Sequence, residues 1–209
     1  MTCSKCSKLV DLCVCSSLRP IDTKLQILIL QHPQEPDHEL GSALLAHWTL
    51  PNSTLKIGLS WANLSAALGK SAIPARWAVL YLGSGIRENK TDSILQFISR
   101  KGIPIPQPET LDGLVVLDGS WSQAKALWWR NPWLLKLKRA IIQNSGPSLY
   151  QELRKEPRKE CLSTIETLAE TLVALGEPAE TGEELRKIFL ELLDKKRLNS
   201  LSKRQKKLG

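Results

Sequence analysis

The sequence predicts an α/β domain built on a largely parallel sheet that is flanked by helices. After Pro20, short runs rich in β-branched and apolar residues alternate with longer amphipathic stretches, as strands and helices do in such domains. The 209 residues are enough for one domain with a full hydrophobic core and short appendages. There is no apolar run of the roughly 20 residues that a membrane helix needs, and no apolar leader follows Met1. We therefore expect a cytoplasmic protein without a membrane partner.

The hydrophobic pattern also predicts the order of the elements. Strands are expected at Leu25–Leu30, Thr54–Leu59, Trp77–Leu82, Leu114–Leu117 and Ala140–Gln143. Helices are expected at Asp37–His47, Thr91–Arg100, Ser120–Trp129, Thr164–Leu175 and Gly182–Arg197.

Two boundaries have a clear local cause. Ser163 and Glu166 have the spacing of a capping box, in which each side chain satisfies backbone N–H groups at the start of a helix. Three prolines between Gly102 and Glu109 exclude a helix there and favour an extended linker. We expect this linker to join two halves of one domain.

Four of the five cysteines lie close together near the N-terminus, at Cys3, Cys6, Cys13 and Cys15. Two adjacent disulfides are not expected in a reducing compartment, whereas four thiolates around Zn²⁺ would hold together a segment too short for its own core. Such a site is structural, because four sulfur ligands leave no open position for a substrate. The alternative is a reduced N-terminus that binds metal only opportunistically. We expect residues 1–20 to form a zinc-binding module.

The net charge of +8 is concentrated at the C-terminus. Seven basic residues and no acidic one lie between Lys195 and Gly209, and the rest of the chain is nearly neutral. A basic segment of this kind suits a polyanion, because each cation that neutralises a phosphate releases counterions. The alternative is a solvated tail that only aids solubility. We assign residues 198–209 to this basic tail.

The motif Asp-Gly-Ser-Trp, beginning at Asp118, follows the expected buried strand Leu114–Leu117 and leads into a helical pattern. Ligands of open α/β sheets bind at such strand ends. Asp118 could act as a base there, and Trp121 offers a stacking surface. The alternative is structural: Asp118 or Ser120 only caps the helix, and Trp121 packs in the core with the two tryptophans that follow at helical spacing.

A second cluster consists of Ser148, Tyr150 and Arg154, followed by Leu162–Glu166. The N-terminus of the helix expected there presents N–H groups that can bind a carboxylate or phosphate, and an arginine can add a bidentate contact. The alternative is that these residues only cap the helix.

In this order, the motifs resemble the DTW-domain family. They are the four cysteines, His32-Pro33-x-Glu35, Asp118-Gly-Ser-Trp121, Ser148-x-Tyr150 and Leu162-Ser-Thr-x-Glu166. The resemblance spans the chain from Cys3 to about Glu170. The family's name motif is Asp-x-Thr-Trp, so Ser120 replaces a threonine here and keeps the hydroxyl. Arg154 lies one residue further from Tyr150 than the family pattern places its arginine.

The resemblance implies a SPOUT-like fold over residues 21–197, with a C-terminal trefoil knot that binds S-adenosylmethionine. It implies transfer of the 3-amino-3-carboxypropyl group to N3 of a tRNA uridine, in the variable loop, with release of methylthioadenosine. Asp118 would be the general base, and Trp121 would support the pocket or stack on a base or on the cofactor. The residues expected to bind the cofactor are Leu117, Asp118, Ser120, Ser148, Tyr150, Leu162, Ser163, Thr164 and Glu166.

Two other readings remain open. One is a related enzyme with the same cofactor, either a ribosomal RNA aminocarboxypropyltransferase or a SPOUT methyltransferase. The other is a non-catalytic zinc-ribbon RNA-binding protein, in which Asp118 and Ser163 are only caps. Under the resemblance the zinc module and the basic tail would grip tRNA. The sequence indicates no obligate protein partner, and we expect a monomer or a homodimer.

Overall fold

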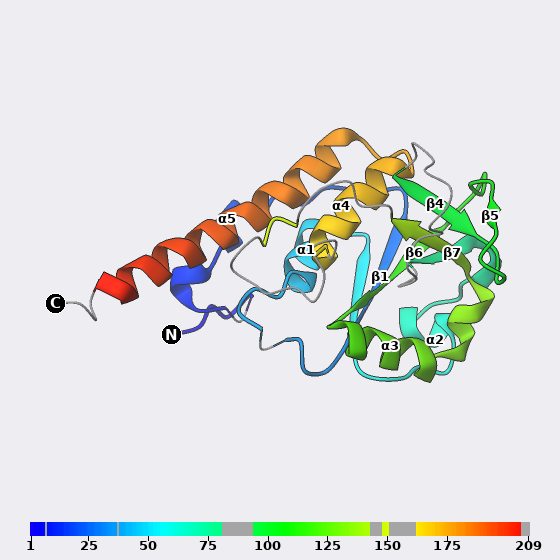
Figure 1. Ribbon diagram of the computed structural model, residues 1–209, viewed down its shortest axis with the longest axis horizontal. Coiled ribbons are helices and arrows are strands. Elements are labelled where there is room, and N and C mark those ends of the chain that lie inside the picture. Colours follow the sequence, from blue (N-terminus) through cyan, green and yellow to red (C-terminus); the bar gives the residue numbers. More distant parts are fainter. Residues whose placement is uncertain (7, 37, 81–93, 143–147, 151–161, 206–209) are drawn as a thin grey trace.

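The sheet at the centre of the molecule is mixed but mostly parallel (Figure 1). The computed structural model describes residues 1–6, 8–36, 38–80, 94–142, 148–150 and 162–205. For residues 203–205 only the backbone is described. Within these ranges the strands are β1 (Gln26–Gln31), β2 (Ser53–Ile57), β3 (Trp77–Leu80), β4 (Leu95–Ile98), β5 (Pro104–Ile105), β6 (Gly113–Asp118) and β7 (Lys138–Ile142). Their order in the sheet is β2-β1-β6-β3-β7-β4-β5. The first five strands in this order are parallel, whereas β4 is antiparallel to both β7 and β5.

Helices cover both faces of the sheet (Figure 1). They are α1 (Ala43–Thr49), α2 (Leu64–Leu68), α3 (Trp121–Arg130), α4 (Thr164–Ala174) and α5 (Ala179–Gln205). One face carries α1, α4 and α5, and the other carries α2 and α3 together with the 3₁₀ turn η4 (Pro132–Lys136). No helix in the described ranges has both the length and the apolar character needed to cross a membrane.

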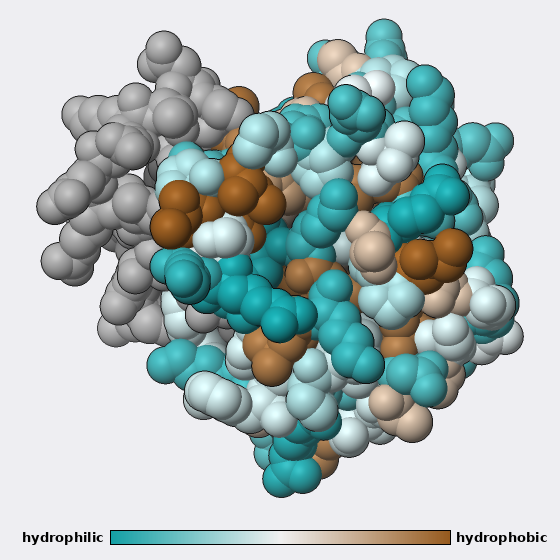
Figure 2. All heavy atoms as spheres, turned by 90° about the vertical axis from the view of Figure 1, so that its right-hand side faces the viewer, coloured by the Kyte–Doolittle hydropathy of each residue, from teal (hydrophilic) through white to brown (hydrophobic). Residues whose placement is uncertain are grey.

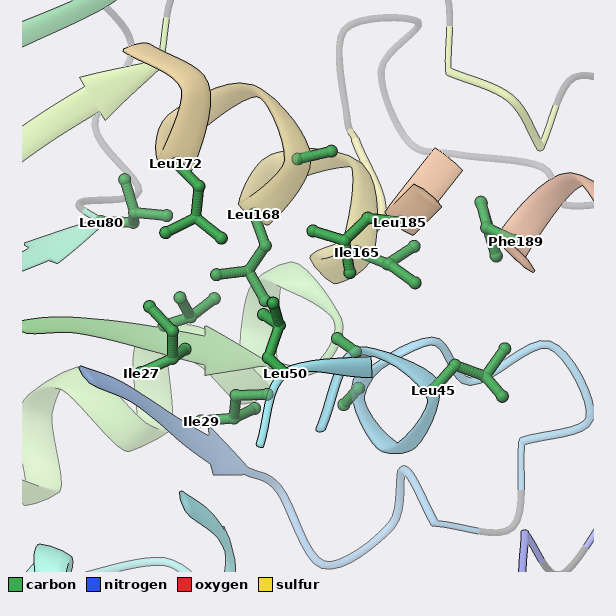
Figure 3. Close-up of a cluster of buried hydrophobic side chains, with 14 of the residues drawn as sticks. Ile27, Ile29, Leu45, Leu50, Leu80, Ile165, Leu168, Leu172, Leu185 and Phe189 are labelled. Carbon is green, nitrogen blue, oxygen red and sulfur yellow. The ribbon is translucent and has the colours of Figure 1, made fainter. Parts of the chain in front are cut away.

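Alternation along the central strands builds two separate cores. In β1, Ile27 and Ile29 face α1 and α4, whereas Leu28 and Leu30 face α2 and α3. Figure 3 shows the first core, where leucine and isoleucine side chains from α4 point towards those of β1. All four of these β1 residues are fully buried. Both faces of the central strands are therefore apolar, as in a parallel sheet covered on each side.

The five strands expected from the sequence are present, with ends that differ by one or two residues where the structure describes them. The helix expected at Thr91–Arg100 is wrong in its described part, because Leu95–Ile98 form β4. All four residues of β4 are buried, and they pair with β7, so a distant partner decides their conformation. The helix expected from Asp37 begins only at Ala43.

The C-terminal helix is longer than the sequence pattern predicts. It runs from Ala179 to Gln205 and so continues past Arg197 into the basic segment. No helix forms between Gly102 and Glu109, as expected, and Pro104–Ile105 form the short edge strand β5. The short helix α2 was not expected, although its ends carry recognisable signals: the Asn63 side chain caps its first turn, and Gly69 ends it with a φ of 78°.

Candidate active site and metal centre

Asp118 ends β6 at the carboxyl edge of the parallel strands, directly beside the end of β1. Its carboxylate is buried and accepts two hydrogen bonds from different elements. Gln31 Nε2 donates to Oδ2 at 2.8 Å, and the Thr164 hydroxyl donates to Oδ1. The backbone carbonyl of Asp118 accepts from His32 N at 2.9 Å. The side chain is therefore held between β1 and the first residue of α4.

The start of α4 is the predicted capping box. Ser163 Oγ accepts from Glu166 N at 3.3 Å, and Glu166 Oε2 accepts from Ser163 N at 2.9 Å. The same carboxylate also accepts from Ser148 Oγ at 2.9 Å and from Leu149 N at 2.6 Å. Glu166 is buried, so its two oxygens fix both the helix start and the segment at residues 148–150.

Tyr150 lies in the core that α1, α4 and α5 form on one face of the sheet. Its ring is buried edge-on against Phe189 of α5, with ring centroids 5.1 Å apart. Its hydroxyl donates to the backbone carbonyl of Leu40 at 3.1 Å. Two residues further along, Ser42 Oγ accepts from Ile165 N at 3.4 Å. The turn before α1 is thus tied to the segment at residues 148–150 and to the start of α4.

The turn between β6 and α3 is held by a second capping box. Ser120 Oγ accepts from Gln123 N, and Gln123 Oε1 accepts from Ser120 N at 2.5 Å. Gly119 has a φ of 157°, and a Cβ there would lie 2.9 Å from the Cβ of Gln123. Ser120 therefore caps α3. Asp118 instead accepts hydrogen bonds from Gln31 and Thr164.

The structure brings some of the predicted site residues together and separates others. Asp118 is hydrogen-bonded to Thr164, and Ser163, Glu166 and Ser148 form a second hydrogen-bonded group. The two groups meet at the adjacent residues Ser163 and Thr164. Of the other predicted members, Tyr150 N donates to Ser148 Oγ at 3.3 Å, and Ser120 caps α3. Leu117 is buried in the core under α3, the Leu162 side chain is half-buried, and Trp121 lies on α3 with Lys125 Nζ 5.5 Å from its ring centroid. Arg154 lies outside the described residues.

Gln31 is the site residue that sequence reasoning missed. It ends the apolar run of β1 and is buried, although glutamine is mostly exposed in proteins. A polar residue that closes a buried parallel strand, just before His32, is a usable signal for a strand-end site.

The four N-terminal cysteines form the candidate metal centre. The Cys3 and Cys15 sulfurs lie 3.9 Å apart, and those of Cys6 and Cys13 lie 3.8 Å apart. All four sulfurs lie within 4.8 Å of one another. A disulfide has an S–S length of about 2.05 Å, whereas tetrahedral Zn–S bonds of about 2.3 Å place the sulfurs about 3.8 Å apart. The spacing therefore fits a metal ion and not disulfides.

The thiols of this cluster differ in their surroundings. Hydrogen bonds from the backbone, first at Cys6 and then at Lys5, lower the pKa of the Cys3 thiol to about 6. Burial raises the pKa of the Cys6 and Cys15 thiols. Only thiolates bind a metal, so an ion at the centre would supply the charge that stabilises the Cys6 and Cys15 sulfurs as anions.

The cysteine segment is joined to the rest of the protein by two lysines. Lys8 is buried, and its Nζ donates to the carbonyls of Glu39 at 2.8 Å and Gly41 at 2.9 Å. Lys195 of α5 donates to the carbonyl of Cys13 at 2.5 Å. Figure 1 shows the N-terminal segment beside the C-terminal half of α5. Lys8 thereby connects the metal centre to the turn before α1 that also contacts Tyr150.

Comparison with known proteins gives consistent matches. The family model described as "DTW domain" matches residues 1–197. A Drosophila melanogaster protein named tRNA-uridine aminocarboxypropyltransferase 2 is 31% identical over 207 residues, which cover 91% of this chain and 71% of that protein. An Arabidopsis thaliana protein named tRNA-uridine aminocarboxypropyltransferase A is 29% identical, with coverage of 91% and 77%. A mouse protein named tRNA-uridine aminocarboxypropyltransferase 2 is 28% identical, and the match covers 83% of this chain but 56% of that protein. No solved structure matches the chain significantly.

Proposed function

Because this chain belongs to the DTW domain family, we propose that it is a tRNA-uridine aminocarboxypropyltransferase. Its similarity to relatives of that name, over most of its length, carries the proposal. The structure supports it with a buried carboxylate, Asp118, at the carboxyl edge of a mostly parallel sheet. Ligands of open α/β sheets bind at this edge.

The proposed co-substrate is S-adenosylmethionine, whose sulfonium makes the aminocarboxypropyl carbon electrophilic. Uridine N3 forms the new bond to that carbon, the carbon–sulfur bond breaks with its electron pair going to sulfur, and methylthioadenosine leaves. The N3 proton has to be removed during the attack. Asp118 is the proposed general base, a role worth roughly 10²–10⁴ in rate. Gln31 and Thr164 would hold this carboxylate in one orientation.

The cofactor pocket is proposed to lie between the end of β6 and the start of α4. Its proposed lining is Leu117, Ser120, Ser148, Tyr150, Leu162, Ser163, Thr164 and Glu166. The Glu166 carboxylate already accepts four protein hydrogen bonds, and the Tyr150 hydroxyl donates to Leu40. These two side chains would therefore shape the pocket, and backbone groups beside them would contact the ligand. We also propose that the C-terminal part of the domain forms the trefoil knot of a SPOUT-like fold. Most of the chain between β7 and α4 lies outside the described residues.

We also propose that the metal centre holds Zn²⁺ and is structural. Four cysteine sulfurs with tetrahedral spacing complete the coordination of zinc and leave no position for a substrate. The module and the basic end of α5 would together contact the tRNA backbone, because they lie side by side in the fold.

The proposal is tested by mass spectrometry of nucleosides from unmodified tRNA incubated with the protein and S-adenosylmethionine. We expect 3-(3-amino-3-carboxypropyl)uridine with wild type and a loss of roughly 10²- to 10⁴-fold in rate with Asp118→Asn. The matched control is Asp112→Asn, directly before the first residue of the same strand, where the carboxylate pairs with exposed Arg76 at 2.6 Å. A methylated nucleoside would support a methyltransferase instead. No product from any tRNA, with RNA binding intact, would support a binding module.

A further inference from the structure

One side of α3 presents aromatic and basic side chains in alternation. Trp121, Lys125, Trp128 and Trp129 are separated by four, three and one residues, so they lie along one side of the helix. The buried side of α3 is formed by Ala124 and Leu127 instead. We call these four side chains the tryptophan stripe.

Of the three tryptophans in the stripe, Trp128 packs partly against the core beneath α3. Trp129 is 78% exposed, and Trp121 and Trp128 are half-buried. At 78% exposure, Trp129 leaves most of its apolar surface in water, at a cost that burial elsewhere would avoid. It is therefore a candidate for contact with a partner.

Cations accompany the rings. Lys125 Nζ lies 5.5 Å from the ring centroid of Trp121, and Arg139 Cζ lies 5.4 Å from that of Trp128. The sequence contains five basic residues and no acidic residue between Asp118 and Glu152. The stripe thus lies in a stretch of chain whose ionisable side chains are all positive, which favours an anionic partner.

The neighbouring surface argues against a large apolar partner. Figure 2 shows the side of the molecule on which β5 and β7 lie, and there the hydrophobic residues form small groups separated by hydrophilic ones. A stable protein interface instead has a desolvated apolar centre. Stacking surfaces interleaved with cations are typical of proteins that bind single-stranded nucleic acid.

We propose that the tryptophan stripe binds unpaired nucleotides of the RNA substrate next to the target uridine. Bases would stack on Trp129 and Trp128, while Lys125 and Arg130 would contact phosphates. The stripe begins directly after Asp118, and Trp121 and Trp129 lie about 12 Å apart along the helix axis, roughly the length of three stacked nucleotides. The identity of the RNA as tRNA rests on the proposed function, whereas the binding of nucleotides by the stripe does not.

The test is the affinity of the protein for a fluorescently labelled, unmodified tRNA transcript, measured without S-adenosylmethionine. Trp129→Ala is expected to weaken binding about five- to hundredfold, the effect of losing one stacked base. Trp129→Phe keeps an aromatic face and is expected to retain most of the affinity. Trp129→Leu keeps apolar area without an aromatic face and is expected to bind as weakly as Trp129→Ala. The control is Leu190→Ala, which removes an exposed apolar side chain from a part of α5 with charges of both signs: Glu183, Arg186, Lys187, Glu191, Asp194 and Lys195.

The contribution of charge is read from the salt dependence. Lys125→Gln should reduce the steepness of the plot of log affinity against log salt concentration by about 1, the change expected for the loss of one phosphate contact. Unchanged affinity in Trp129→Ala, or Leu performing as well as Phe at position 129, would overturn the proposal. A wild-type dimer that Trp129→Ala converts to monomer, with unchanged RNA affinity, would also overturn it and assign the stripe to a second copy of the chain.

The assay also separates this inference from the proposed function. If wild type modifies tRNA while Trp129→Ala binds and reacts normally, the inference fails and the function stands. If no modified uridine forms but Trp129→Ala binds RNA poorly, the function fails and the inference stands. Where both hold, we expect Trp129→Ala to raise the KM for tRNA and to leave kcat unchanged at saturating tRNA, because Trp129 takes no part in the proton transfer assigned to Asp118.

Discussion

Glu166 shows how one buried side chain can organise the candidate site. Its carboxylate accepts hydrogen bonds from Ser163 N, Ser163 Oγ, Ser148 Oγ and Leu149 N. The bonds to Ser163 follow from the Ser-x-x-Glu spacing and were predicted. The bonds to residues 148 and 149 were not, because they depend on a segment that returns from elsewhere in the chain. Local chemistry is readable from sequence, and its long-range partners are not.

We predict that Glu166→Gln destabilises the protein by about 2–3 kcal/mol, because the amide group turns one acceptor into a donor that faces other donors. The change is measured as the free energy of unfolding in urea. An unchanged free energy would contradict the assigned hydrogen bonds.

Glu170, one helical turn after Glu166, provides the matched control, because its replacement by glutamine is expected to stabilise the protein at neutral pH. Burial raises the pKa of its carboxyl, and Glu166 adds to the effect, while Arg186 opposes it. A raised pKa means that the fold favours the protonated form, so this stabilisation is present in acid and is lost as the pH rises through that pKa. Glu170→Gln should therefore be slightly more stable than wild type at pH 7, by a fraction of a kcal/mol after solvent screening. The difference should disappear below the ordinary carboxyl pKa of 4.5.

At the scale of elements, strands with strong local patterns were predicted and those set by distant pairing were not. The apolar runs of β1 and β6 identify buried parallel strands. Leu95, Phe97 and Ile98 of β4 would also suit the buried side of a helix, and pairing with β7 and β5 makes them part of a strand. The strand ends that carry Gln31 and Asp118 meet because β1 and β6 are register partners, which no local pattern specifies.

The close contact between β1, β6 and β3 depends on a glycine. A Cβ at Gly113 would lie 2.4 Å from the carbonyl oxygen of Gln26 and 2.6 Å from the Trp77 ring. We predict that Gly113→Ala lowers the free energy of unfolding by about 1–3 kcal/mol, because the strands must move apart.

The control for that substitution is Gly69→Ala. Gly69 has a φ of 78° and nothing within 4 Å of an added Cβ, so it carries only the backbone cost of about 1–2 kcal/mol. Thermal unfolding of Gly113→Ala, with Gly69→Ala beside it, checks the prediction. A Gly113→Ala variant as stable as wild type would show that the sheet has more room than the structure gives it.

At the scale of the whole molecule, the metal centre and the candidate active site are joined through the protein. Lys8 links the cysteine segment to the turn before α1, and Leu40 and Ser42 in that turn contact Tyr150 and the start of α4. The four cysteines were predicted from spacing alone. Their coupling to the rest of the chain was not, because Lys8 is a buried lysine with carbonyl partners that only the fold brings close.

We predict that removal of the metal lowers thermal stability and weakens the site at the start of α4. Cys6→Ser should reduce bound zinc, measured by elemental analysis, and should lower the melting temperature by several degrees. Cys161→Ser, at the fifth cysteine of the sequence, is the control and should keep the full zinc content. Equal zinc content in the two variants would contradict the assignment of the four cysteines as ligands.

The most direct test of the central claim uses S-adenosylmethionine labelled in two different places. One preparation carries the label in the carboxyl carbon of the methionine part, and the other carries it in the methyl group. After incubation with wild-type protein and unmodified tRNA, the account predicts label in a uridine nucleoside from the carboxyl-labelled preparation alone. Label from the methyl group, or no transfer from either preparation, would contradict it.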